Sequence, residues 1–209
     1  MQDILDELSG HGKEVFTIND MEKITKKPKK YISKQLSTNR KVISIERGKY
    51  FIDKGTGIDL YEISSGIVFP SYVSLFSAFQ YYSITDQMVN TYSVISLKRH
   101  RKIIFGENIL EFKTIGRERF FGYERVNNIF IASIEKAIVD SLYFNTPSFS
   151  YTKEAFSNAT RRDAIDIDRL IEYSRKMNSL AVKSPVKPPS YISSFFRRVQ
   201  SNVGKIKIF

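Results

Sequence analysis

Residues 26–41 carry the pattern that most constrains this chain, because apolar and basic side chains recur there with the period of a helix. At about 100° per residue, Ile32 and Leu36 fall on one face and Lys30 and Lys34 on the opposite face. An apolar face of this kind packs in a core, and the basic face remains available to an anion. The pattern therefore predicts an amphipathic helix that presents lysines to a negatively charged partner.

The sequence on either side predicts a small module around this helix. Two helices are expected before it, within residues 3–24, the second capped by Asn19, with a short extended piece between them. Residues 42–52 alternate in polarity on both sides of a turn at Arg47-Gly48, which is the pattern of a β-hairpin. Three helices and a hairpin predict a winged helix-turn-helix domain over residues 1–54.

Positive charge is concentrated in this module. Residues 23–49 hold ten Lys or Arg against one acidic residue, in a chain whose formal net charge is +11. Lysines suit phosphates, and hydroxyls can reach base edges in the major groove, so we expect double-stranded DNA as partner, with a solvated charge run as the alternative. The expected DNA-binding residues are Lys26, Lys27, Lys29, Lys30, Ser33, Lys34, Ser37, Thr38, Lys41, Arg47 and Lys49.

Composition restricts the class of protein. With 42% hydrophobic residues the 209-residue chain can bury a core, and without Cys it has no disulfide and no thiolate chemistry. The sequence has no run of 18 apolar residues, and the first residues lack the pattern of a signal peptide. We therefore expect a cytoplasmic protein without a membrane span.

A second domain is expected over residues 58–209, after a Gly-containing linker at residues 53–57. The apolar spacing after Pro70 predicts a helix over residues 70–79, and Ser133 is expected to cap another over 133–144. Together with the strands this gives an α+β domain with a mostly antiparallel sheet and C-terminal helices. The predicted strands cover residues 92–97, 103–105, 109–115, 120–123 and 129–131.

Two further basic segments lie outside the first domain. One is an exposed loop between two strands, expected to follow a phosphate backbone, to meet an acidic partner, or to be a solvated turn. The other is an amphipathic helix after the Pro-rich residues 184–189, expected to pack on the domain or a partner, with membrane-surface binding as the alternative. The possible contact residues are Lys98, Arg99, Arg101, Lys102, Arg197 and Arg198.

The sequence offers little for catalysis, and we expect no enzyme, no cofactor and no metal site. His11 and His100 have no partner at the spacing of metal ligands. Glu111 and Lys113 share one face of a predicted strand and, with a second carboxylate such as Asp86, could serve a metal-dependent nuclease, which is the enzymatic alternative. A non-enzymatic RNA-binding module is a further alternative, and it would stack single-stranded bases on exposed aromatic residues.

Four segments of the chain, in this order and spacing, resemble the landmarks of the AbiEi antitoxin family. They are PSYVSLFSA at 70–78, YSVISLKR at 92–99, FFGYE at 120–124 and IASIEKAIVDSLY at 131–143, of which the Glu-Lys-Ala helix is the most diagnostic.

The resemblance covers most of the chain and implies a winged helix followed by an α+β domain. It also implies a repressor that binds its own promoter and serves as antitoxin in a type IV toxin–antitoxin (abortive infection) system, with an AbiEii-like nucleotidyltransferase as toxin. A stand-alone winged-helix regulator without a toxin is the alternative. We expect a monomer or weak dimer on an inverted-repeat operator.

Overall fold

The computed structural model describes residues 5, 10, 14–53, 55 and 58–181, with the backbone alone for 178–181. The chain divides into two compact units, each described separately below. Unit 1 comprises Met1–Val73, Asn90–Thr114 and Arg125–Ile131, and unit 2 comprises Ser74–Val89, Ile115–Glu124 and Ala132–Phe209. The chain contains both helices and strands, which is compatible with the expected α+β class.

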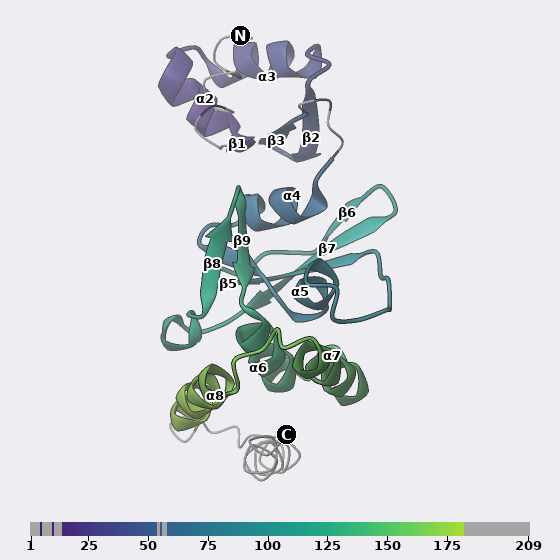
Figure 1. Cartoon of the computed structure of the whole chain (residues 1–209). Coiled ribbons are helices and arrows are strands. Elements are labelled where there is room, and N and C mark those ends of the chain that lie inside the picture. Colours follow the sequence, from purple (N-terminus) through teal and green to yellow (C-terminus); the bar gives the residue numbers. More distant parts are fainter. Residues whose placement is uncertain (1–4, 6–9, 11–13, 54, 56–57, 182–209) are drawn as a thin grey trace, which may run out of the picture. The chain divides into compact units, whose positions relative to one another are not determined.

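The N-terminal part of unit 1 is a three-stranded antiparallel sheet with two helices (Figure 1). The strands are β1 (Val15–Thr17), β2 (Val42–Glu46) and β3 (Lys49–Ile52), in the order β1-β3-β2, and the helices are α2 (Ile18–Thr25) and α3 (Lys29–Ser37). The expected extended piece and hairpin are thus confirmed. Apart from Leu5, which is helical and fully buried, the first expected helix lies outside the described residues.

Helix α2 begins two residues earlier than the sequence pattern predicts. Its cap is Thr17 rather than Asn19, which is exposed. The Thr17 hydroxyl accepts from the Asp20 backbone N–H at 3.1 Å, and the Asp20 carboxylate accepts from the Thr17 N–H at 2.8 Å. This reciprocal capping box satisfies two backbone donors at the start of the helix.

The three-stranded sheet contributes to a hydrophobic core on each of its faces. Successive side chains on a strand point to opposite sides, so neighbouring residues enter different cores. Phe16 and Ile52 pack with Met21, Ile32 and Leu36 of the two helices. Their strand neighbours, Val15 on β1 and Phe51 on β3, belong to a second core. That second core also contains side chains of α4 (Leu60–Ile67), β6 (Ile103–Phe105) and β7 (Asn108–Thr114), chiefly Ile63, Ile67, Ile103 and Leu110.

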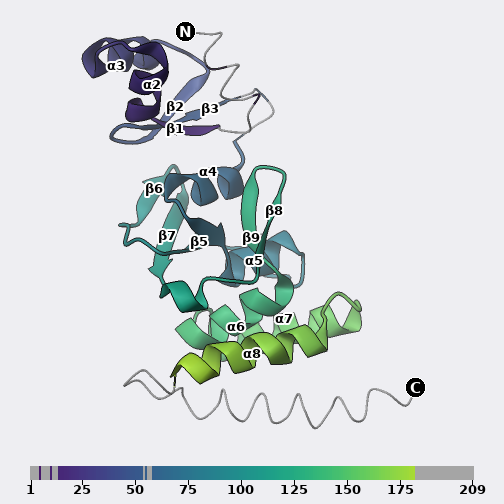
Figure 2. The ribbon, with the colours of Figure 1, turned by 90° about the vertical axis from the view of Figure 1, so that its left-hand side faces the viewer.

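Helix α4 therefore joins the N-terminal sheet to the rest of unit 1. It contacts β1 on one side and, on another, β4 (Ser71–Val73) and β5 (Thr91–Ser96) of a second sheet, and Figures 1 and 2 show it between the N-terminal sheet and these strands. The units accordingly differ from the two expected domains of residues 1–54 and 58–209, since unit 1 extends through α4 into the second sheet. That residues 1–54 and residues 58–209 fold independently of each other remains a prediction.

The second sheet has six strands in the order β6-β7-β5-β4-β9-β8. It is mixed, which corrects the expected mostly antiparallel sheet: β5 pairs with β7, and β4 with β9, in parallel, whereas β4–β5 and β6–β7 are antiparallel. The physical reason is that β7 inserts between β5 and β6, so these two consecutive strands are not neighbours and β5 pairs in parallel with β7 instead. The strands are β4 (Ser71–Val73), β5 (Thr91–Ser96), β6 (Ile103–Phe105), β7 (Asn108–Thr114), β8 (Tyr123–Val126) and β9 (Ile129–Ala132).

The helix expected over residues 70–79 is divided between strand β4 and helix α5 (Leu75–Tyr81). Tyr72 is fully buried on the strand, and Leu75 and Phe79 are fully buried on the helix. A segment buried on every side shows the same apolar spacing in either conformation, so periodicity alone could not place the change. Likewise Phe120 lies after a short 3₁₀ turn (Arg117–Arg119), and the predicted strand there begins only at Tyr123.

Unit 2 is organised around helix α6 (Ile134–Phe144). This helix packs against α5, α7 (Phe149–Arg161) and α8 (Ile167–Ala181), and Figure 2 shows α6, α7 and α8 side by side. Ser133 caps it as expected, because its hydroxyl accepts from the Lys136 backbone N–H at 3.3 Å.

Candidate nucleic-acid interface

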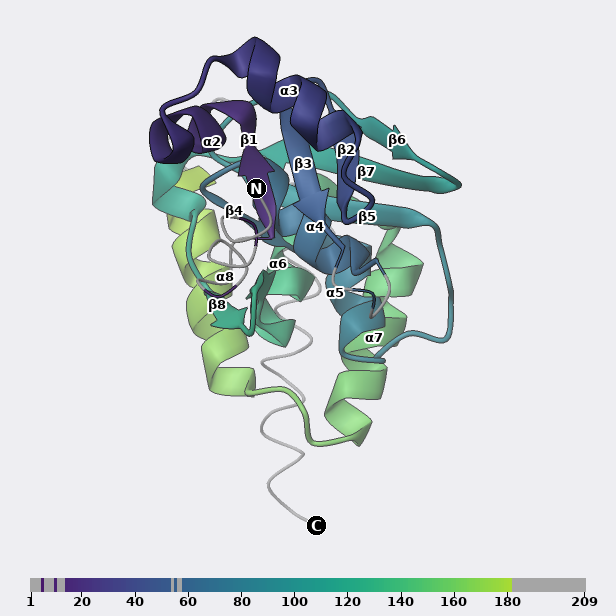
Figure 3. The ribbon, with the colours of Figure 1, turned by 90° about the horizontal axis from the view of Figure 1, so that it is seen from above.

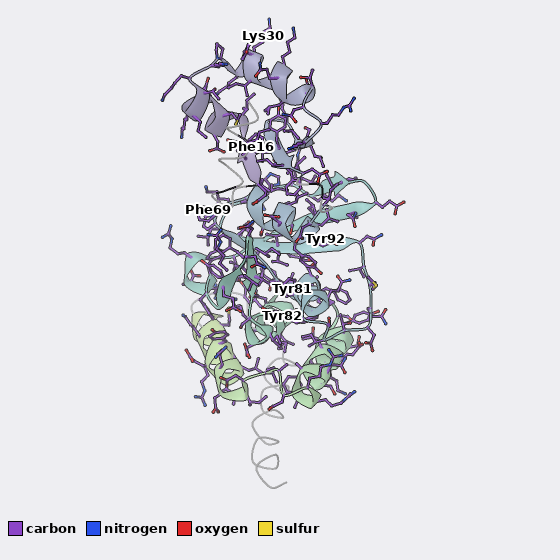
Figure 4. All side chains as sticks on the ribbon, turned by 45° about the horizontal axis from the view of Figure 1, so that its top comes forward. Phe16, Lys30, Phe69, Tyr81, Tyr82 and Tyr92 are labelled. Atoms are coloured by element: carbon purple, nitrogen blue, oxygen red, sulfur yellow. The ribbon has the colours of Figure 1, made fainter. Side chains whose placement is uncertain are left out.

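Helix α3 has the phase that the sequence predicts. Ile32 and Leu36 are 0% and 1% exposed, while Lys30 and Lys34 on the opposite face are exposed. Figure 3 looks onto α2 and α3, and Figure 4 shows Lys30 extending outward from α3. The helix thus buries one side in the first core and presents its lysines to solvent.

The helix is shorter than the predicted residues 26–41. Lys26 ends α2 in the left-handed conformation, with φ of +57°, and Pro28 then starts α3. Lys26 and Lys27 therefore lie in the turn before α3, and Lys41 follows the helix next to β2; all three are exposed. Lys29 is partly neutralised, since its Nζ lies 3.5 Å from the Glu22 carboxylate of α2.

The hydroxyls on α3 differ in what they can offer a ligand. Ser37 donates to the Lys34 carbonyl at 2.8 Å, and Thr38 donates to the Gln35 carbonyl at 3.1 Å. Because each hydroxyl hydrogen is already used within the helix, these two side chains can only accept. Ser33 is exposed on the same helix.

Tyr31 and Gln35 form a pair that the sequence pattern did not single out. Tyr31 is 44% exposed although it is a large aromatic residue, and Gln35 Nε2 donates to its hydroxyl at 2.7 Å. Lys27 Nζ lies 4.8 Å from the centre of the Tyr31 ring, a cation–π contact. One signal was available in the sequence, because residues 31 and 35 are one turn apart and adjoin the lysine face.

The hairpin and the loop at residues 98–102 meet around one carboxylate, that of Glu46. Lys49 Nζ lies 2.8 Å from it, His100 Nε2 3.1 Å and an Arg101 Nη 3.8 Å. Burial alone would raise the pKa of Glu46, but the hydrogen bonds and charges of Lys49 and His100 hold it below its usual value.

The structure therefore brings the two predicted basic segments of unit 1 together, and it engages Lys49 in an ion pair. The other basic residues here, Arg47 at the hairpin turn and Lys98, Arg99, Arg101 and Lys102 on the loop, are exposed. Arg197 and Arg198 lie outside the described residues.

A second polar contact between the N-terminal sheet and the rest of unit 1 involves two acids. Asn128, in the β8–β9 turn, donates to the Glu14 carboxylate at 3.0 Å, and Glu14 is 1% exposed. Burial, and then the neighbouring Glu14 carboxyl, raise the pKa of Glu62 on α4 to about 7; Asp59 adds to the rise and Asn128 opposes it.

The Glu-Lys-Ala helix, α6, uses its charged residues to hold unit 2 together. Lys136 and Asp140 form an ion pair with both side chains 0% exposed, and Asp140 also accepts from the Ser74 hydroxyl at 2.9 Å. Burial lowers the pKa of Lys136, and the Asp140 charge opposes this effect. Glu135 accepts from the Asp166 backbone N–H at 2.9 Å, where α8 begins. These contacts give the motif a structural role.

The residues of the nuclease alternative do not gather into a visible metal site. Glu111 and Lys113 are half-buried and pair with each other at 3.6 Å, and Asp86 is exposed. Across the residues that the structure describes, no group of three or more His, Asp or Glu is placed to hold a metal ion. None of the helices in that part of the chain is long and apolar enough to cross a membrane.

Comparison with known proteins adds no relative to these observations: no protein-family model and no curated protein matches the chain.

Proposed function

We propose that this protein is a sequence-specific, double-stranded DNA-binding repressor of the winged helix-turn-helix type. The observation that carries the proposal is the division of α3 into a fully buried face, with Ile32 and Leu36, and an exposed lysine face, with Lys30 and Lys34. A helix of this kind fits the major groove, where lysines contact phosphates and polar side chains reach base edges.

The surroundings of α3 support the same function. The order β1-α2-α3-β2-β3 is compatible with a winged helix-turn-helix, in which β2 and β3 would be the wing. Arg47 at the hairpin turn and the exposed basic loop joined to that hairpin through Glu46 would contact the adjacent phosphate backbone. Two copies on an inverted repeat would occlude a promoter.

The resemblance to the AbiEi family extends the proposal to an antitoxin role. Under it, the protein represses its own promoter and neutralises an AbiEii-like nucleotidyltransferase through a surface separate from α3. This part rests on the family-like segments, whose Glu-Lys-Ala helix serves packing here. Without a toxin gene nearby, the protein would be a stand-alone repressor.

The DNA-binding proposal is tested with the full chain and duplexes that tile its own upstream region. Lys30→Gln with Lys34→Gln should weaken the best duplex by roughly tenfold or more, by loss of two charge contacts. Lys153→Gln with Arg175→Gln is the matched control, because it removes two exposed charges from α7 and α8. Equal effects of the two double variants, or no binding by the wild type, would refute the proposal.

The antitoxin role is tested by co-expression with the nucleotidyltransferase encoded nearest to the gene. The Lys30→Gln, Lys34→Gln variant should derepress the promoter and still protect cells. A truncation before residue 58 is a poor probe, because it would expose Ile63 and Leu110, which share a core with Phe51. Failure of the folded wild type to protect cells would leave the repressor role alone.

A further inference from the structure

The Tyr31–Gln35 pair on α3 has a hydrogen-bonding pattern that fits one base. The inference rests on the proposed function and concerns how α3 would distinguish sequences. Going around α3 in steps of about 100°, the buried residues Ile32 and Leu36 are followed by Tyr31 and Gln35, and then by Lys30 and Lys34. The pair thus lies beside the lysine face, where a helix in the groove would approach base edges.

The Gln35 amide is already oriented before any ligand arrives. One of its two N–H groups donates to the Tyr31 hydroxyl oxygen at 2.7 Å. Lys27 Nζ lies 4.8 Å from the centre of the Tyr31 ring. This leaves one N–H donor and the carbonyl oxygen of Gln35 for a partner. Fixing the amide in advance reduces the entropy that a base contact would otherwise lose.

One donor beside one acceptor matches the major-groove edge of adenine. The Gln35 oxygen would accept from adenine N6–H, and its N–H would donate to adenine N7. Guanine presents two acceptors, O6 and N7, so the Gln35 oxygen would face an acceptor. Ser37 and Thr38 provide no competing donor, because their hydroxyl hydrogens are bonded to the helix backbone.

We propose that Gln35 reads an adenine in the major groove and that Tyr31 is the positioning residue that fixes the Gln35 amide. Lys30 and Lys34 would anchor phosphates on either sequence, so affinity and base preference would depend on different stripes of the same helix.

The test is selection of binding sites from a random duplex library by the full chain, followed by competition with single-base variants of the best site. For the wild type, replacing one A·T pair by G·C should weaken binding on the order of tenfold. Gln35→Ala should remove the preference at that position alone, and Tyr31→Phe should reduce it, since the freed amide can turn over. Lys30→Gln should weaken binding to all sequences and leave the preference unchanged.

Other outcomes would overturn the inference. A wild-type preference for guanine at the position affected by Gln35→Ala would contradict the amide orientation. A selected site whose base preferences are unchanged in both Gln35→Ala and Tyr31→Phe would remove these residues from base recognition while leaving the repressor proposal intact. Failure to select any sequence would instead refute the proposed function itself. Far-UV circular dichroism of each variant checks that α3 remains folded.

Discussion

The buried ion pair between Lys136 and Asp140 should be essential to the stability of unit 2. Both side chains are 0% exposed, so Lys136→Met would leave the Asp140 carboxylate in a low-dielectric core with the opposing charge removed. Breaking a buried pair in this way typically costs about 3 to 5 kcal/mol. We expect a loss of about 3 kcal/mol, at the lower end of this range, because the Ser74 hydroxyl still donates to Asp140.

Methionine keeps the unbranched stem of Lys136, so the substitution removes the charge and little packing. Lys136 Nζ lies 3.9 Å from Met177 Sδ and 4.7 Å from the centre of the Phe121 ring, which are surroundings that a thioether tolerates. The second substitution is Asp140→Asn, which removes the partner charge and keeps an oxygen for Ser74. The Lys136→Met, Asp140→Asn variant should regain at least about 1 kcal/mol over Lys136→Met alone.

The assay is urea unfolding of the full chain. Far-UV circular dichroism monitors the transition, because the chain has no Trp for fluorescence. The wild type, both single variants and the double variant form a complete thermodynamic cycle. A loss below about 1 kcal/mol for Lys136→Met, or a double variant less stable than both single variants, would refute the assignment of a stabilising buried pair.

Three other changes probe unit 1 by thermal or urea unfolding. Ile32→Ala should destabilise it by about 2 to 5 kcal/mol, because it empties a fully buried position; unchanged melting would contradict the phase of α3. The pKa of Glu62 is raised above its unfolded value, so the contribution of Glu62 to the free energy of unfolding is complete at low pH and is lost as pH rises through about 7. Glu62→Gln should therefore remove a decline in the free energy of unfolding of at most about 1 kcal/mol per pH unit, and a pH profile unchanged from that of the wild type would contradict the raised pKa of Glu62. Gly66→Ala should destabilise by about 1 kcal/mol or more although alanine favours helices, because a Cβ there would lie 2.7 Å from Val15 Cβ; stabilisation would show that α4 and β1 can move apart.

Local features of the sequence predicted the elements with strong periodicity. The phase of α3, the β2–β3 hairpin and the Ser133 cap follow from spacing and cap chemistry within a few residues. Helix α4 was missed because its second half, Ser64-Ser65-Gly66, has low helix propensity. It forms because Asp59 caps it, accepting from the Tyr61 N–H at 2.8 Å, and because Ile63 and Ile67 are buried in a shared core.

Long-range contacts could not be predicted from one sequence. The insertion of β7 beside β5 depends on pairing across the sheet, and the links from Glu46 to His100 and from Glu14 to Asn128 join residues far apart in the chain. The same limit applies to the candidate site. Exposed lysines on α3 follow from the helix phase, but the pairing of Lys49 with Glu46 depends on a bulge between β2 and β3.

The most direct measurement of the central claim is the salt dependence of DNA binding by the full chain. Each phosphate contact releases counterions, so the logarithm of the association constant should fall linearly with the logarithm of salt concentration. Lys30→Gln with Lys34→Gln should reduce the magnitude of that slope by about 1.8, at about 0.9 per lost contact. The Lys153→Gln, Arg175→Gln control should keep the wild-type slope. A slope that is equal in all three proteins would contradict the account, because the lysines of α3 would then not contact DNA.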